Sequence, residues 1–235
     1  MSALIKIDHL GFAWPGQAEL LDIPHFRLEP GERLFLHGPS GSGKTTLLGL
    51  LGGVQTPGRG QVRVLGQDLA RLPARARDRF RVEHTGYLFQ QFNLLPFLSV
   101  QDNVTLPCRF SPARARRAQA RDGTVEASAS RLLAALGIAP ALHVRRADTL
   151  SIGQQQRVAA ARALIGQPEL VIADEPTSAL DADAREAFLR LLFDECRAAG
   201  ASLLFVSHDR GLAALFDRQC SLVELNQARP PLEAV

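Results

Sequence analysis

Lysine is almost absent from this sequence: Lys6 and Lys44 are the only two among 235 residues, and the other basic side chains are arginine. No apolar run approaches the roughly 20 residues that a membrane-spanning helix needs. The longest uncharged stretches, such as Gly86 to Gln101, are broken by Gln, Asn and Pro. Three cysteines, Cys108, Cys196 and Cys220, are too few, odd in number and too far apart for a disulfide framework or a zinc site. We therefore expect reduced cysteines and no membrane-spanning segment.

The segment 1–6 lacks the basic region, apolar core and small-residue cleavage site of a secretory signal. We therefore expect the chain to stay in the cytosol. Its 235 residues, of which 46% are hydrophobic, suffice for the core of one α/β domain.

Two arginine runs raise the question of nucleic-acid binding. They comprise Arg75, Arg77, Arg79 and Arg81, and Arg114, Arg116, Arg117 and Arg121. A basic stripe suits a phosphate backbone, but no aromatic residues are interleaved here for base stacking. We interpret both runs as solvated helix faces and expect no nucleic-acid partner.

Hydrophobic patterning predicts two kinds of strand. Apolar residues alternate with polar ones in Leu4–Ile7 and Gln61–Leu65, which indicates a small antiparallel sheet. Three other runs are nearly continuously apolar, and polar residues and a helical pattern follow each of them: Leu34–His37, Leu170–Ala173 and Leu203–Val206. Such runs are typical of parallel strands that are covered on both faces.

Helical spacing appears in two regions. Four apolar residues share one face of a helix that follows the acidic start Asp181 to Asp183: Phe188, Leu191, Leu192 and Cys196. Between about 92 and 149 the sequence is rich in Ala and Arg, with three leucines at helical spacing: Leu132, Leu133 and Leu136. We expect a helical subdomain at about 92–149, inserted into the α/β core.

A glycine-rich segment connects the run Leu34–His37 to a helical pattern. It reads Gly38-Pro39-Ser40-Gly41-Ser42-Gly43-Lys44-Thr45 and continues into Thr46. Glycines let backbone N–H groups wrap an anion, and the helix directs its positive end at that anion. The order strand, loop, helix predicts a P-loop (Walker A) in which Lys44 contacts the β and γ phosphates and Thr45 ligates Mg²⁺. The alternative is a Gly/Ser-rich turn that carries a lysine by chance, which the scarcity of lysine disfavours.

Two adjacent carboxylates end the apolar run Leu170–Ala173. Ligands bind at the carboxyl ends of strands in such sheets, so Asp174 and Glu175 are placed to act there. We expect Asp174 to hold Mg²⁺, largely through water, and Glu175 to act as general base on the attacking water. The alternative, a plain acidic turn, rarely follows four apolar residues.

Four further segments complete an ordered set. They are Gln90, Leu150-Ser151-Ile152-Gly153-Gln154, Ser178-Ala179-Leu180-Asp181 and His208. With the phosphate loop and the acidic pair, they resemble the Q-loop, signature, D-loop and switch histidine of the ABC transporter ATPase family, in the family's order and over nearly the whole chain. The resemblance implies a single domain at 1–235. Its fold would be a P-loop NTPase (RecA-like) core at about 1–91 and 150–235, with an N-terminal antiparallel β subdomain and the inserted α-helical subdomain.

The resemblance also assigns roles to individual residues. Gln90 would contact Mg²⁺ and sense the γ-phosphate, and His208 would contact the γ-phosphate. His208 alone would more often be structural, but its place after a core strand and before Asp209 favours the switch role. Trp14 would stack on adenine, with Phe12 as a rival.

The signature carries a second pattern, because Ser151 and Gln154 have the Ser-x-x-Gln spacing of a capping box. Both readings can hold, since a helix N-terminus is itself an anion site. The resemblance implies that the signature and the D-loop contact the nucleotide that a second copy binds. The residues involved would be Ser151, Gly153, Gln154 and Asp181. Ile152 stands where the usual signature has Gly. We expect binding to survive this departure and dimer closure or turnover to change.

The resemblance implies an ATPase that uses ATP and Mg²⁺ and closes as a homodimer around nucleotide. It would energise a separate transmembrane permease from the cytoplasmic face of the inner membrane. A nucleic-acid-associated ABC ATPase is disfavoured, because translation factors of the family carry two cassettes and DNA-repair members carry long coiled-coil or zinc insertions, and neither is seen here. The serious alternative is a cell-envelope regulator that moves a membrane partner without carrying solute. Segments 89–96 and 150–163 look most like the lipoprotein-releasing and macrolide-export group.

A dense apolar group follows Gln90 without helical or strand alternation. Its members are Phe92, Leu94, Leu95, Phe97 and Leu98. One interpretation is core packing. The other is that part of it forms, with the helical subdomain, a groove for a short cytoplasmic helix of the permease.

Overall fold

The computed structural model describes residues 2–228, so residue 1 and residues 229–235, the ends of the expected domain, lie outside it. The chain divides into two compact units. The first comprises residues 1–81 and 204–235, and the second comprises residues 82–203. The predicted subdomain boundaries at 92 and 149 stay a prediction.

The first unit combines an antiparallel sheet with strands of the α/β core. Its elements are β1 (Ile5–Ala13), β2 (Glu19–Leu28), β3 (Arg33–His37), α1 (Lys44–Leu51), β4 (Arg59–Val64), β5 (Gln67–Asp68), most of α2 (Ala74–His84), most of β8 (Ser202–Val206), β9 (Arg218–Ser221) and α8 (Leu222–Leu225), with 3₁₀ turns at Leu69–Arg71 and Arg210–Leu215.

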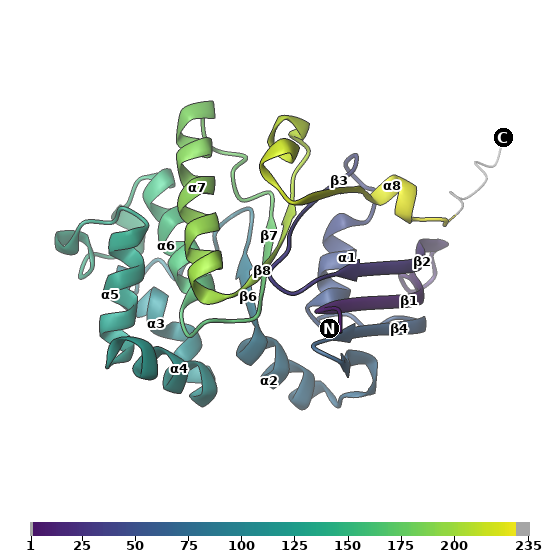
Figure 1. The fold of residues 1–235 in the computed structure, drawn as a ribbon, viewed down its shortest axis with the longest axis horizontal. Coiled ribbons are helices and arrows are strands. Elements are labelled where there is room, and N and C mark those ends of the chain that lie inside the picture. Colours follow the sequence, from purple (N-terminus) through teal and green to yellow (C-terminus); the bar gives the residue numbers. More distant parts are fainter. Residues whose placement is uncertain (1, 229–235) are drawn as a thin grey trace. The chain divides into compact units, whose positions relative to one another are not determined.

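The antiparallel sheet has the strand order β2-β1-β4-β5. Ile5 of β1 is opposite Leu28 on one side and Val64 on the other, and all three are fully buried. The strands predicted at Leu4–Ile7 and Gln61–Leu65 are confirmed, although β1 begins one residue later and continues to Ala13, and β4 begins two residues earlier and ends one residue earlier. Figure 1 shows α1 beside β1, β2 and β4. Strand β2 was not predicted; it contains Pro24, which is tolerated because β2 is an edge strand.

The apolar run Leu34–His37 forms β3, whose Leu34, Phe35 and Leu36 are fully buried. This strand pairs in parallel with β9 and has β8 as its other neighbour. Past the end of β8, the Ser207 N–H donates to the Leu36 carbonyl at 3.2 Å. The segments that follow β3 and β8 therefore leave from the same edge.

The second unit is mostly helical. Its elements are β6 (Thr85–Leu88), α3 (Val100–Phe110), α4 (Pro112–Asp122), α5 (Val125–Ala135), α6 (Ile152–Leu164), β7 (Leu170–Asp174) and α7 (Ala182–Ala199), with 3₁₀ turns at Pro140–Leu142 and Ala147–Thr149. Side-chain caps start α3, α4 and α5, because Ser99, Ser111 and Thr124 each accept a backbone N–H three residues ahead.

Helix α6 lies at the centre of this unit, where it contacts α3, α5, α7 and β6. Figure 1 shows α3 to α6 gathered together, with α7 alongside α5 and α6. Strand β6 pairs in parallel with β7, with Leu88 opposite Ala173. The run Leu170–Ala173 is completely buried, which confirms the prediction of a strand covered on both faces.

The predicted helix after Asp181 is α7, and Asp181 caps it by accepting the Ala184 N–H at 2.8 Å. Phe188, Leu192 and Cys196 are buried as expected. Leu191 is only half-buried, and Leu189 and Phe193 occupy the buried face instead. The buried face of α7 is thus wider than the single stripe read from the sequence.

The interpretation of both arginine runs as solvated faces is wrong for four residues: Arg77, Arg81 and Arg117 are half-buried and donate to backbone carbonyls, and Arg114 is buried. Arg75, Arg79, Arg116 and Arg121 are exposed, as expected. Arg114, however, is only 2% exposed. Its guanidinium donates to four backbone carbonyls and so satisfies the donors that burial removes from water.

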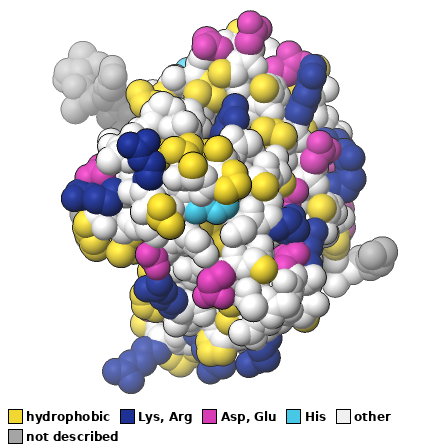
Figure 2. All heavy atoms as spheres, turned by 90° about the vertical axis from the view of Figure 1, so that its left-hand side faces the viewer, with side chains coloured by type: hydrophobic (Ala, Val, Ile, Leu, Met, Phe, Trp, Pro, Cys, Tyr) yellow, Lys and Arg dark blue, Asp and Glu magenta, His cyan; other side chains and the backbone are white. Residues whose placement is uncertain are grey.

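Within residues 2–228, no helix combines the length and apolar character required to traverse a bilayer. Figure 2 shows one face of the molecule, on which acidic and basic side chains are interspersed with hydrophobic ones.

Candidate nucleotide-binding site

The phosphate loop connects β3 to α1 and turns through left-handed backbone. Gly41 and Gly43 have φ angles of 79° and 94°, which L side chains rarely adopt. A Cβ on Gly43 would also lie 2.8 Å from Leu21, and one on Gly38 would lie 2.9 Å from the Ser42 Oγ. The glycine spacing read from the sequence therefore reflects both backbone conformation and close packing.

The loop presents donors to an anion. Gly43, the N-cap of α1, provides no side-chain cap, and the N-terminus of a helix favours an anion. The Ser42 Oγ is buried and has no hydrogen-bond partner among the described residues. An orphaned hydroxyl in a loop of inward-turned backbone fits a phosphate oxygen.

Lys44 lies folded over the loop. Its Nζ donates to the carbonyls of Gly38 and Pro39 at 2.8 and 2.9 Å. These carbonyl bonds hold the ammonium beside the loop, where it can exchange them for phosphate oxygens. Thr45 is an exposed residue, whereas the next residue, Thr46, is half-buried.

Trp14 and Phe12, the two candidates for stacking on adenine, differ in exposure. Phe12 lies in β1 and is 7% exposed, whereas Trp14 follows the strand and is 37% exposed. The two rings meet edge to face, 5.1 Å apart. Phe12 therefore packs against Trp14 from the core, and of the two rings Trp14 is the one exposed enough to stack on a ligand.

His208 is exposed and follows Ser207 at the end of β8. Asp209 begins the next turn and accepts the Gly211 N–H at 3.0 Å. Since Ser207 is bonded to Leu36 near the end of β3, His208 and the phosphate loop emerge from neighbouring strand ends in the same unit.

The acidic pair lies in the second unit. Asp174 is the last residue of β7, and Glu175 follows it with a φ of 48°. This left-handed conformation is uncommon for Glu and turns the chain sharply off the strand. Nothing in the residue pattern indicates it, because Glu does not favour that region.

Gln90 is exposed two residues after β6, in the same unit. The turn behind it is fixed, because Phe92 and Asn93 both have positive φ and Arg162 of α6 donates to their carbonyls at 2.5 and 2.6 Å. Sequence reasoning missed Arg162, since no pattern pairs position 162 with positions 92 and 93.

The signature begins α6, and the predicted capping box is confirmed. Ser151 is the N-cap; its Oγ accepts the Gln154 N–H at 3.3 Å, and the Gln154 Oε1 accepts the Ser151 N–H at 3.0 Å. Ile152 does not disturb this arrangement, because its side chain is 56% exposed. A Cβ on Gly153 would lie 3.9 Å from Leu180, so the signature adjoins the D-loop that leads to Asp181.

These features define the class of the protein. A glycine-turned phosphate loop between β3 and α1, together with a strand of the α/β fold that ends in two carboxylates, is the plan of a P-loop ATPase.

Comparison with known proteins identifies the family. The ABC transporter family matches residues 21–178. The lipoprotein-releasing system ATP-binding protein LolD of Anaeromyxobacter dehalogenans is 45% identical over 194 residues, which cover 83% of this chain and 78% of LolD. The macrolide export ATP-binding/permease protein MacB of Chromobacterium violaceum is 41% identical over 217 residues, 91% of this chain and 32% of MacB. This chain thus spans about a third of the length of MacB. The chain belongs to the ABC transporter family.

A solved structure supports the same conclusion. The dimeric post-hydrolysis state of the ATP-binding cassette MJ0796, bound to ADP and Pi, matches with a TM-score of 0.81 and 29% identity over 97% of each chain. The predicted fold class, the family and the ATPase activity are confirmed. The roles of individual site residues stay predictions.

The exposure of Trp14 leads to a spectroscopic prediction. It is the only tryptophan in the chain, and a stacked adenine would change the surroundings of its indole. We expect a saturable fluorescence change on titration with Mg-ATP and its loss in Lys44→Ala. A flat signal, where equilibrium dialysis shows binding, would contradict stacking on Trp14; Trp14→Phe serves as the blank.

Proposed function

We propose that this chain binds Mg-ATP, closes with a second copy around two nucleotides and thereby energises a separate permease of the lipoprotein-releasing and macrolide-export type. The phosphate loop carries this proposal, because its left-handed glycines, the Lys44 ammonium and the orphaned Ser42 hydroxyl are all suited to a polyphosphate. The names of LolD and MacB favour transport over the envelope-regulator alternative.

The first unit contributes most of the residues that bind a chain's own nucleotide. Trp14 stacks on adenine, the loop from Gly38 to Thr45 and the following Thr46 surround the phosphates, and His208 contacts the γ-phosphate. Thr45, with Asp174 and Gln90, would hold Mg²⁺, whose charge screens the phosphate oxygens. Hydroxyl, carboxylate and amide oxygens are suitable ligands for this hard cation.

Glu175 acts as the general base in hydrolysis. Its carboxylate accepts a proton from the water that attacks the γ-phosphorus, while the bond between that phosphorus and the β–γ bridging oxygen breaks. Gln90 senses whether the γ-phosphate is present. The fixed turn at Phe92 and Asn93 transmits a movement of Gln90 to the segment that follows.

The second copy completes each site. The signature residues Ser151, Gly153 and Gln154 and the D-loop Asp181 are presented to nucleotide bound by the partner, with the N-terminus of α6 directed at the γ-phosphate. The dimeric state of MJ0796 supports this assembly. Because only ATP has a γ-phosphate, ATP favours the closed dimer and hydrolysis releases it. The permease would hold the chain at the cytoplasmic face of the inner membrane.

We further propose that the segment after Gln90 docks the permease. Phe92 is 8% exposed and belongs to the core, but Phe97 is 65% exposed. The neighbouring segment adds Val144, which is 80% exposed, because Gln101 donates to the His143 carbonyl at 3.0 Å and so ties the two segments together. An exposed aromatic on a fixed turn is a suitable anchor for an amphipathic helix.

The docking turn, residues 95–98, is held by hydrogen bonds, and the Leu98 N–H donates to the Leu95 carbonyl at 3.1 Å. The fully buried Asn103 bonds to both the N–H and the carbonyl of Leu95, at 2.8 and 3.0 Å. Beyond it lies a hollow of about 410 Å³, lined by Ser99, Gln101, Asp102, Thr105, Arg109, Glu126, His143 and Val144. Figure 2 shows hydrophobic side chains between charged ones of both signs on the face it views.

Replacing the general base tests the hydrolytic mechanism. We expect Glu175→Gln to lower turnover by roughly 10²–10⁴-fold, the usual contribution of a positioned base, and to accumulate ATP-bound dimers. ATP hydrolysis and light scattering measure the two effects, with Lys44→Ala as the variant that cannot bind. Turnover within a few-fold of wild type would remove Glu175 from this role.

Introducing a charged residue at the docking turn tests whether this segment binds the permease. We expect Phe97→Glu to fold and to hydrolyse ATP normally in solution but not to co-purify with its permease from detergent-solubilised membranes, because a carboxylate cannot enter an apolar interface. Phe110→Glu is the matched control, since Phe110 is 70% exposed at the far end of α3. Leu95 is half-buried, so Leu95→Glu distinguishes core packing from docking by whether it folds. Permease binding by both folded variants would refute this surface.

A further inference from the structure

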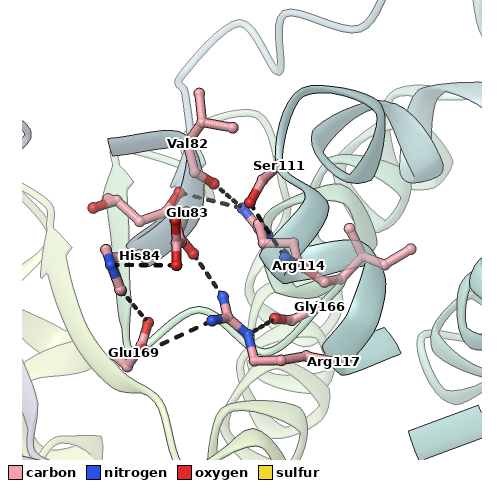
Figure 3. Close-up of polar contacts among 10 residues, drawn as sticks. Val82, Glu83, His84, Ser111, Arg114, Arg117, Gly166 and Glu169 are labelled. Carbon is pink, nitrogen blue, oxygen red and sulfur yellow. Dashed lines mark hydrogen bonds and ion pairs between the residues drawn. The ribbon is translucent and has the colours of Figure 1, made fainter. Parts of the chain in front are cut away.

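Two arginines of α4 bind the C-terminal end of the signature helix α6. Arg114 donates from Nε to the Ile165 carbonyl and from Nη2 to the Ala163 carbonyl, both at 2.7 Å. Arg117 donates from Nε to the Gly166 carbonyl, also at 2.7 Å (Figure 3). The last carbonyls of a helix lack partners within it, and cations are favoured at this negative end.

The same guanidinium groups hold the junction of α2 and β6, because Val82 and Glu83 lie at the end of α2 and Thr85 begins β6. Arg117 donates to the Glu83 carbonyl at 2.7 Å, and Arg114 donates to the carbonyls of Val82 and Thr85, both at 3.4 Å. Figure 3 shows Arg114 beside Val82, and Arg117 between Glu83 and Gly166. The two arginines therefore connect the end of α6 to β6.

Arg117 also faces an acidic group before β7. Its Nη1 lies 3.9 Å from Glu169, which His84 contacts at 3.1 Å. Glu169 thus lies beside both Arg117 and His84, and these neighbours hold the pKa of its carboxyl below the usual value despite burial.

Close backbone approach fixes the same helix end. A Cβ on Gly86 of β6 would lie 2.2 Å from the Ala163 carbonyl oxygen. A Cβ on Gly166, whose φ is +68°, would lie 2.6 Å from the Arg114 carbonyl oxygen. Only glycine fits either place, so β6 and α4 both press directly on the end of α6.

This anchoring carries a cost. Arg114 is fully enclosed, and desolvation lowers its pKa to about 10. Its guanidinium donates to four carbonyls, and a buried charge of this kind is often no more stabilising than a well-packed apolar residue. The burial of Arg114 is therefore better explained by the position in which it holds the end of α6 than by a gain in stability.

The geometry matters at the opposite end of the helix. Ser151 caps the N-terminus of α6 and is exposed, whereas the arginines bind the far end. A helix of 13 residues is about 20 Å long, so a tilt of about 3° at its anchor moves its N-terminus by about 1 Å. A misplacement of about 1 Å can cost roughly 100-fold in rate.

We propose that Arg114 and Arg117 are positioning residues for ATP hydrolysis: by fixing the C-terminal end of α6 on β6, they set where the signature is presented to the partner's nucleotide. This role rests on the proposed function, because it assumes that Ser151 acts on nucleotide bound by the second copy. The proposal predicts different effects on nucleotide binding by one chain and on closure of the dimer. A chain's own phosphate loop does not involve α6, so ADP binding should not depend on these arginines.

The test uses Arg117→Ala and Arg114→Lys, the second of which keeps the charge but loses the planar fork of donors. We expect both to bind Mg-ADP within about twofold of wild type and to lose about tenfold or more in kcat, because the misplaced signature acts only after closure. In a Glu175→Gln background, ATP-driven dimerisation should require about tenfold more ATP. Arg116→Ala, an exposed change on the same helix, should match wild type in every assay.

Two results would overturn the positioning role. One is a folded Arg117→Ala chain with wild-type turnover and dimerisation. The other is a loss of Mg-ADP affinity as large as the loss of turnover, which would indicate general damage. If Arg114→Lys does not fold, Arg117→Ala decides alone, since Arg117 is only half-buried. A wild-type chain that never dimerises with ATP contradicts the proposed function instead.

Discussion

The candidate phosphate loop of the first unit depends on one turn, in which the chain passes from β3 into α1 through left-handed backbone. Left-handed glycines make this turn possible, and Gly43 has no room for a side chain because Leu21 of β2 presses against it. The antiparallel sheet therefore supports the loop directly. It also supplies Phe12, which backs the exposed ring of Trp14.

The second unit is organised around α6, whose two ends are held by different interactions. A capping box fixes the local start of the helix at the signature, and the α4 arginines fix its far end on β6. Between these ends, Arg162 holds the turn behind Gln90. The segment proposed to sense the γ-phosphate and the segment proposed to contact the partner's nucleotide are thus parts of one bonded framework.

Local patterns predicted what depends on local chemistry. Continuous apolar runs gave β3, β7 and β8, and the Ser-x-x-Gln spacing gave the cap of α6. The edge strand β2 escaped notice because Pro24 interrupts its pattern. Arg114 was misassigned, since its spacing on α4 does not reveal that four distant carbonyls surround it. The left-handed turns at Glu175 and Phe92 had no signal either, because tertiary packing imposes them on residues that do not favour them.

In the proposed mechanism, one chain cannot complete an ATP site, and each site needs the signature of a second copy. Specific ATPase activity across a dilution series, with the monomer–dimer distribution measured in the same samples, tests this most directly. Activity per chain should fall as the dimer population falls and vanish where the chain is monomeric. Constant activity per chain down to concentrations at which only monomer is present would contradict it.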